Sequence, residues 1–187
     1  MIPSDQQILE RVQKIIAEVL RIPRGQVTPD SLLGEDLGGE SLDFVDIQFG
    51  LETDCGVEFY QGGTVDKLAE VLAPQKLEEN ELLSSFGAGV LQARMPEVDP
   101  ARLQQGQPAA GIESLYTPRT WVRVIKEILS ARPRACPKCG SDQLKIVRPS
   151  VLLCQACRNE IYCPTGEECL ETWAKNVAGS LQGIHKT

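Results

Sequence analysis

Two Cys-x-x-Cys pairs restrict what this chain can fold into more than any other feature of its sequence. Cys136 and Cys139 form the first pair, and Cys154 and Cys157 form the second pair after 14 intervening residues. Four cysteine thiolates at this spacing can hold one metal ion in a closed tetrahedral site. So short a segment cannot build a hydrophobic core of its own, so we interpret the metal as structural. The last third of the chain is therefore predicted to hold a small metal-stabilised module.

The residues between the two pairs fit a β-hairpin. Residues 144–147 and 151–153 read as its two strands, and Gly140 suits the turn that leaves the first pair. This pattern resembles a zinc ribbon of the rubredoxin-like kind, which implies zinc, although four thiolates also suit iron. A catalytic zinc is not expected, because such sites keep one of the four positions open. By spacing, Cys163 is an alternative to Cys157 as the fourth ligand.

Charge and composition narrow the class of protein. The 187 residues allow one domain or two small ones, and the formal net charge is −7. Residues 1–80 carry 16 acidic and 6 basic side chains, whereas residues 81–187 carry 10 acidic and 13 basic ones. Phosphates repel so acidic a chain, so no nucleic-acid partner is expected. No apolar run approaches the roughly 18 residues of a membrane helix, and no signal peptide is visible. We therefore expect a cytoplasmic protein without a membrane span.

The first 80 residues predict a small helical domain. Ser4 and Gln7 form a capping box before apolar residues at helical spacing, and Pro23 ends that helix. A second helix is expected over residues 41–54, and a last one from Thr64 to Pro74. For the second helix we expect an apolar side made of Leu42, Val45, Phe49 (or Ile47) and Leu51. Asp43 and Asp46 are three residues apart, so we expect them to share an exposed edge.

Ser41 stands at the start of the second helix, directly behind Gly38, Gly39 and Glu40. A helix N-terminus has unpaired N–H groups and a partial positive charge, so it stabilises a phosphate group. The glycines remove side chains from the approach path. A phosphodiester on Ser41 would sit well there. The alternative is that Ser41 is merely the cap of the helix.

The segment Leu37-Gly38-Gly39-Glu40-Ser41-Leu42, with the helix order around it, resembles the acyl carrier protein family over about residues 5–75. The resemblance implies a four-helix bundle whose serine, here Ser41, carries 4′-phosphopantetheine, an arm that holds an acyl group as a thioester. It implies Glu40, Asp43 and Asp46 as partner contacts. The implied partners are a phosphopantetheinyl transferase and acyl-loading and acyl-processing enzymes with basic docking surfaces. The family usually has Asp before the serine, where this chain has Glu40.

The remaining segments connect and flank these modules. Residues 77–116 read as a partly helical linker, with a helix over residues 79–94 and a loop rich in Pro, Gly and Gln after it. Thr117 caps a helix whose first residue is Pro118. The basic edge of that helix, Arg119, Arg123 and Lys126, is expected to pack on the next domain; the alternative is that it pairs with the acidic face of the carrier. Thr165 and Glu168 form a capping box for a C-terminal helix.

The sequence thus predicts a mainly α protein with two modules. Residues 1–76 form the acyl-carrier bundle, residues 77–116 the linker, and residues 117–187 a zinc ribbon β-hairpin with a flanking helix on either side. The predicted function is an acyl carrier for fatty-acid, polyketide or related lipid biosynthesis, with the ribbon serving stability or partner docking. An enzyme is not expected, because no nucleophile–base pair and no open metal site is visible. The alternative is an unmodified carrier-like zinc-binding scaffold or regulatory interaction protein. The oligomeric state stays open.

Overall fold

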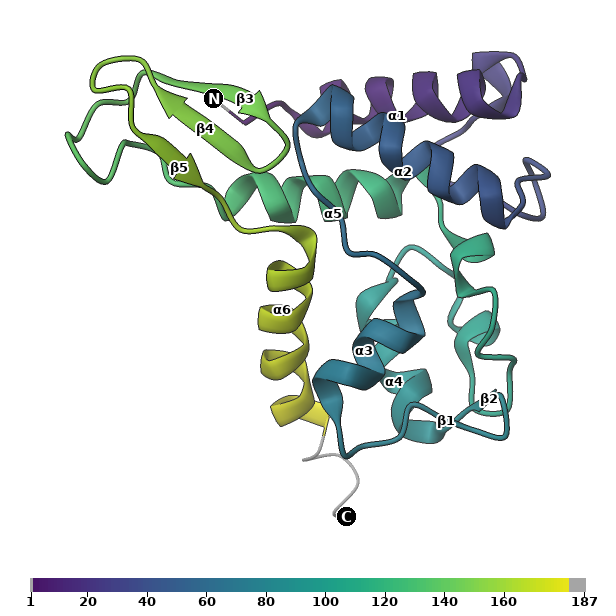
Figure 1. The fold of residues 1–187 in the computed structure, drawn as a ribbon. Coiled ribbons are helices and arrows are strands. Elements are labelled where there is room, and N and C mark those ends of the chain that lie inside the picture. Colours follow the sequence, from purple (N-terminus) through teal and green to yellow (C-terminus); the bar gives the residue numbers. More distant parts are fainter. Residues whose placement is uncertain (1, 182–187) are drawn as a thin grey trace.

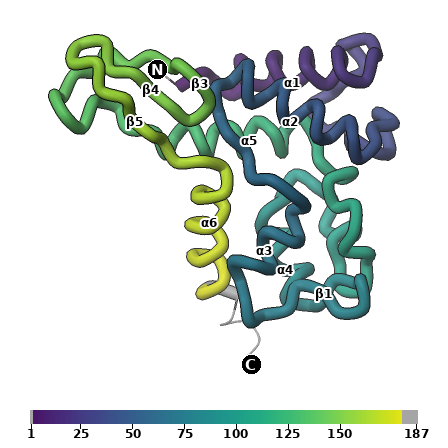
Figure 2. Tube along the Cα trace, viewed as in Figure 1, coloured from purple at the N-terminus to yellow at the C-terminus, as the bar shows by residue number. Residues whose placement is uncertain are grey.

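Helices are the main regular structure, and they gather at two ends of the molecule with a small sheet projecting from one side (Figures 1 and 2). The computed structural model describes residues 2–181. One end contains α1 (Asp5–Leu20), α2 (Ser41–Cys55) and α5 (Pro118–Ser130), and the other contains α3 (Thr64–Leu72), α4 (Ser85–Arg94) and α6 (Gly166–Leu181). None of the helices within the described range is long and apolar enough to cross a membrane.

The helix starts follow the predicted caps. At α1, the Ser4 N–H donates to Gln7 Oε1 at 2.9 Å, and the Gln7 N–H donates to Ser4 Oγ at 3.3 Å. Thr117 caps α5, and Glu168 accepts from the Thr165 N–H at 2.9 Å just before α6. In each case, residues three positions apart in the sequence pair the backbone N–H groups at the helix start. Because these contacts are local, the spacing of the residues was enough to predict them.

The carrier region is arranged differently from the bundle that the resemblance implied. α1 packs against α2 and α5, whereas α3 packs against α6 and the 3-10 turn Ile112–Leu115. Figure 1 accordingly shows α5 lying along α1 and α2, with α3 below them. A helix from outside residues 1–76 therefore completes the packing of α1 and α2. The expectation that the helix of Thr117 and Pro118 packs on the next domain is therefore wrong in its main contact, because α5 packs chiefly on α1 of the carrier region.

Trp121 of α5 is the centre of this packing. Its side chain is 1% exposed. Its ring centroid lies 5.1 Å from that of Phe44, 5.4 Å from that of Phe59 and 5.2 Å from that of Tyr116. Such tilted and edge-to-face pairs add to the free energy gained by burying the rings. One aromatic cluster thus joins α2, the segment after it and α5.

The buried face of α2 differs from the expected one. The helix buries one stripe of side chains, which are Phe44, Ile47, Leu51 and Cys55. Leu42, Val45 and Phe49 are instead 79%, 56% and 70% exposed. Both sets recur at helical spacing, so periodicity alone could not choose between them. The expectation was right for Leu51 and for the alternative Ile47, and wrong for the other three residues.

Residues 77–116 pack into the molecule rather than bridging two modules. They include the short strands β1 (Glu78–Glu79) and β2 (Leu82–Leu83), α4, and the 3-10 turns Pro100–Leu103 and Ile112–Leu115. Their side chains join the same hydrophobic core as α1, α2, α3, α5 and α6; the largest apolar side chains that are fully buried are Leu77, Leu83, Leu91, Met95 and Leu103. The expected helix over 79–94 begins only at Ser85, because Asn80 and Glu81 turn the chain with positive φ. The segment is partly helical as expected, but its burial is not that of a linker.

The segment predicted to hold a metal forms a three-stranded antiparallel sheet. β3 (Leu144–Arg148) pairs with β4 (Val151–Cys154), as the hairpin prediction required, and β4 pairs with β5 (Glu160–Tyr162), which was not predicted. The sheet is tied to the segment after α2, because the Ser150 N–H donates to Gly56 O at 3.0 Å. Gly56 also lies so close to Ile146 that an added Cβ would come within 2.8 Å of its side chain. The ribbon is therefore held against the helical body.

Candidate functional site

Ser41 is the first residue of α2, and its side chain is exposed. Its hydroxyl makes no hydrogen bond within residues 2–181. The capping position belongs to Glu40, whose backbone N–H donates to Asp43 Oδ2 at 2.8 Å. The alternative that Ser41 is merely the helix cap is therefore wrong, and its hydroxyl is available for chemistry at a helix N-terminus.

A tight turn leads into Ser41. Gly38 has a φ of +71°, a conformation that side-chain-bearing residues rarely adopt. The Gly38 N–H donates to Gly34 O at 3.0 Å, and the Gly39 N–H donates to Leu33 O at 2.8 Å. A Cβ on Gly39 would come within 2.8 Å of the Leu33 side chain. Both glycines are thus needed for the backbone geometry of the turn, beyond keeping the approach to Ser41 clear.

The turn rests on the 3-10 turn Ile112–Leu115 and the residue after it. The Leu33 N–H donates to Tyr116 O, and the Gly34 N–H donates to Ser114 O, both at 2.9 Å. Arg102 adds an ion pair with Glu35 at 2.6 Å. Residues 102–116 therefore position the loop that presents Ser41. Sequence reasoning missed this role, because the contacts join segments about 80 residues apart and leave no local pattern.

Acidic and apolar side chains share the exposed surface of α2. Glu40 and Asp46 are exposed, whereas Asp43 is half-buried and its carboxylate is occupied by the cap. Leu42, Val45 and Phe49 lie between and beyond these carboxylates along the same helix. We call Leu42, Val45, Asp46 and Phe49 the outer face of α2. Three exposed apolar side chains this close together are typical of a surface that another molecule covers.

The basic residues of α5 do not cover this outer face. Arg119 pairs with Asp30, Arg123 pairs with Glu97 at 2.5 Å, and Lys126 pairs with Asp5 at 2.5 Å. The alternative is thus met in part for the described residues: Arg119 and Lys126 pair with carboxylates of the carrier region, but with Asp30 and Asp5 rather than with Asp43 or Asp46. The acidic face of α2 stays open to other molecules.

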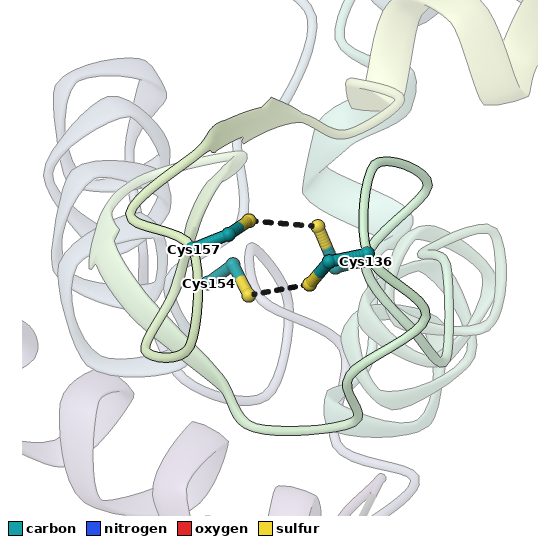
Figure 3. A group of neighbouring side chains, drawn as sticks. Cys136, Cys154 and Cys157 are labelled. Atoms are coloured by element: carbon teal, nitrogen blue, oxygen red, sulfur yellow. Dashed lines mark hydrogen bonds between the residues drawn. The ribbon is translucent and has the colours of Figure 1, made fainter.

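The four cysteines predicted as ligands lie together at one end of the ribbon. Their sulfur atoms all lie within 4.8 Å of one another. Figure 3 shows the side chains of Cys136, Cys154 and Cys157 pointing into a common space. The sulfur atoms lie 3.7 Å apart in Cys136 and Cys157 and 3.6 Å apart in Cys139 and Cys154. Four sulfurs at about 2.3 Å from one ion would be about 3.8 Å apart in a tetrahedron. The donor set and its spacing therefore fit a single tetrahedral zinc or iron ion.

The backbone turns tightly at both cysteine pairs. Cys136 O accepts from the Gly140 N–H at 2.8 Å, and Cys154 O accepts from the Arg158 N–H at 2.9 Å. The last residue of each turn has positive φ, +75° at Gly140 and +62° at Arg158. The Cys157 N–H, donating to the sulfur, lowers the pKa of Cys154 to about 6. The neighbouring thiols raise the pKa of Cys139 in turn, so within this coupled pair the charge is favoured on Cys154.

Cys163 is not part of this group. It is buried in the small core of the ribbon, and its sulfur donates to Ile161 O at 3.8 Å. Burial raises the pKa of its thiol, which keeps it neutral. The alternative in which Cys163 replaces Cys157 is therefore not supported by the arrangement of the sulfurs.

Comparisons with known proteins bear on the region around Ser41. Residues 10–72 match the family model described as "Phosphopantetheine attachment site". Over 55 residues, or 29% of this chain, the sequence is 38% identical to the acyl carrier protein of Cyanidioschyzon merolae and 42% identical to that of Saccharopolyspora erythraea. The matched stretch spans 60% and 58% of those two proteins, and thus less than two thirds of either.

A third relative is matched over more of its length. The acyl carrier protein of Guillardia theta is 40% identical over 55 residues, which make up 68% of that protein and 29% of this chain. No solved structure matches this fold. The match of residues 10–72 includes Ser41, the turn before it and the whole of α2. By these similarities, the chain belongs to the acyl carrier protein family.

Proposed function

We propose that this chain is an acyl carrier that bears 4′-phosphopantetheine on Ser41. The observation that carries the proposal is the exposed Ser41 hydroxyl, which has no hydrogen bond within the described residues and stands at the N-terminus of a 15-residue helix. When bound, the arm supplies a terminal thiol that holds an acyl group as a thioester. The chain itself is then a carrier, and other enzymes act on the group that it holds.

The residues around Ser41 fit the phosphate of such an arm. Backbone N–H groups in the first turn of α2 have no acceptor within the helix and favour a negative charge. Gly38 and Gly39 place no side chain beside the hydroxyl. The carboxylate of Asp43 is held by the Glu40 N–H, which fixes the start of the helix. Ser41 is thereby presented on a rigid support.

The outer face of α2 suits the partners that the carrier needs. A phosphopantetheinyl transferase and acyl-processing enzymes must approach Ser41 closely. Glu40 and Asp46 would contact basic residues of such enzymes, and Leu42, Val45 and Phe49 would be buried in the contact. Opposite charges speed the encounter, and the apolar side chains supply contact area. We expect Asp43 to act chiefly through the cap.

For the ribbon we propose a structural metal, zinc in the first place, held by Cys136, Cys139, Cys154 and Cys157. Four thiolates leave no open position on the ion, so it would hold the strands together without taking part in a reaction. Iron fits the same four donors. The contacts of Ser150 and Ile146 with Gly56 support a stabilising role towards the segment after α2.

The intact mass of the purified protein tests the carrier function. The protein is incubated with coenzyme A and a broad-specificity phosphopantetheinyl transferase, and 3′,5′-adenosine diphosphate leaves as Ser41 Oγ is esterified. We expect the gain of one phosphopantetheinyl group in the wild type and none in Ser41→Ala. Ser85→Ala is the matched control, because Ser85 is also an exposed first residue of a helix. Folded wild-type protein that gains nothing from several transferases would favour the unmodified scaffold instead.

A further inference from the structure

A cleft of about 990 Å³ lies between the helical body and the ribbon, far from Ser41. Its walls come from the start of α1, the ends of α2 and α5, and strands β3 and β4. Much of the lining is apolar; the main contributors are Ile8, Cys55, Leu129, Leu144, Ile146 and Leu152. Burial raises the pKa of the Cys55 thiol to about 11, so this side chain lines the cleft in its neutral form. The size is that of a small-molecule site.

Positively charged side chains outnumber carboxylates in the lining of this cleft. Asp54 is paired with Arg11, whose Nη1 lies 3.4 Å from its carboxylate. The cleft is also lined by three more cationic side chains, Arg132, Arg134 and Lys145, and by one more carboxylate, Asp142. None of these four makes an ion pair within residues 2–181. The cleft therefore carries a surplus of positive charge beside an apolar lining.

Arg132 is the most buried of the unpaired cations in this cleft, and no carboxylate among the described residues pairs with it. Its Nη2 donates to Gly56 O, and its Nε is buried without an acceptor. Removal from water lowers the pKa of this guanidinium, because the charged form loses hydration that no carboxylate replaces. A bound anion would stabilise the charged guanidinium of Arg132 in place of the lost hydration. The apolar lining beside Arg132 could at the same time bind an apolar part of the same ligand.

We propose that this cleft binds a small carboxylate with an apolar chain, the carboxylate lying at Arg132 and the chain on the apolar wall of α1, β3 and β4. A planar guanidinium matches a carboxylate in geometry and charge. The site is separate from the attachment site, since the length of α2 places Ser41 about 21 Å from Cys55. The proposal does not depend on loading of Ser41. The ribbon then has a second role, because β3 and β4 form one wall of a binding site.

Calorimetric titration of the full chain with decanoate tests the proposal. The Ser41→Ala protein is used, so that no arm can occupy the cleft and failure of loading is a separate matter. We expect decanoate to bind one to one, decanol to bind at least tenfold more weakly, and binding of decanoate to weaken as salt is added. Arg132→Gln should reduce the affinity for decanoate at least tenfold. Arg119→Gln is the matched control, because Arg119 lies at the other end of α5 and pairs with Asp30.

Lys145→Glu covers the case in which Arg132→Gln does not fold. Lys145 is exposed on β3, so its replacement leaves the packing intact, and we expect the same loss of affinity. Thermal unfolding of each variant is measured alongside. Equal binding of decanol and decanoate, or unchanged affinity in a folded Arg132→Gln or Lys145→Glu protein, would overturn the proposal. Tighter binding of decyl phosphate than of decanoate would overturn the assignment of a carboxylate.

Discussion

At the scale of single residues, Gly34 shows how closely the turn before Ser41 approaches its support. Gly34 donates to Ser114 O, and an added Cβ would lie 2.8 Å from Ser114 Cβ, an atom fixed to the backbone. Gly34→Ala should therefore lower the free energy of unfolding by about 1–3 kcal/mol, as overpacking does elsewhere. Urea unfolding followed by circular dichroism measures the change.

Gly25 provides the control for this substitution. A Cβ at Gly25 would meet no atom within 4 Å, and its φ is not positive. Gly25→Ala should be neutral or raise the free energy of unfolding by about 0.4–1 kcal/mol, because it restricts the unfolded chain. If the two alanine variants had the same stability, the contact between Gly34 and Ser114 would not be what holds the turn.

At the scale of the element, α2 has two apolar faces with different roles. Phe44 is 6% exposed and packs on Trp121, whereas Phe49 is 70% exposed. Phe44→Ala should lower the free energy of unfolding by about 3–5 kcal/mol, because it leaves a cavity. Phe49→Ala should change it by no more than about 0.5 kcal/mol. Similar losses in the two variants, measured by urea unfolding, would contradict the assignment of the buried face.

The sequence could predict those features of α2 that depend on near neighbours. Its start at Ser41 followed from the glycines and the spacing around them, and the hairpin between the cysteine pairs followed in the same way. The choice between Phe44 and Phe49 depends on where α5 lies, because Trp121 comes from a segment nearly 80 residues away. The turn before Ser41 likewise depends on a distant residue, because Tyr116 O accepts from the Leu33 N–H. Single-sequence patterns carry local capping and periodicity, and such distant pairings leave no trace in them.

The ribbon offers a test of which cysteines hold its metal. We expect about one ion per chain, measured by elemental analysis of purified protein, which also distinguishes zinc from iron. Cys157→Ser should remove nearly all of it, because the sulfur of Cys157 lies within the group of four. Cys163→Ala should keep it, although losing a buried side chain lowers stability. Loss of the ion in Cys163→Ala with retention in Cys157→Ser would reverse the assignment.

At the scale of the whole molecule, one hydrophobic core runs through both ends of the helical body. The core includes residues from all six helices within the described range, and only the ribbon has a small core of its own. α5 connects the two ends, because Trp121 packs on Phe44 and Glu127 pairs with the buried Arg94 of α4 at 2.8 Å. This arrangement predicts that the helical body unfolds as one unit, which separate carrier and C-terminal modules would not do.

The two tryptophans report on the two ends of that core. Trp121 lies among Phe44, Phe59 and Tyr116. The ring of Trp173 in α6 lies against the guanidinium of Arg94, whose Cζ is 5.0 Å from the ring centroid.

The variants Trp121→Phe and Trp173→Phe each leave a single tryptophan as the fluorescent probe. Replacing Trp121 by phenylalanine keeps an aromatic ring in the core and removes a buried Nε1 that lacks an acceptor, which offsets part of the packing lost. In each variant the fluorescence of the remaining tryptophan should follow the same urea transition as the circular dichroism signal. A fluorescence midpoint that departs from the circular dichroism midpoint in either variant would mean that the two ends unfold separately, and that α5 docks between modules that are stable on their own.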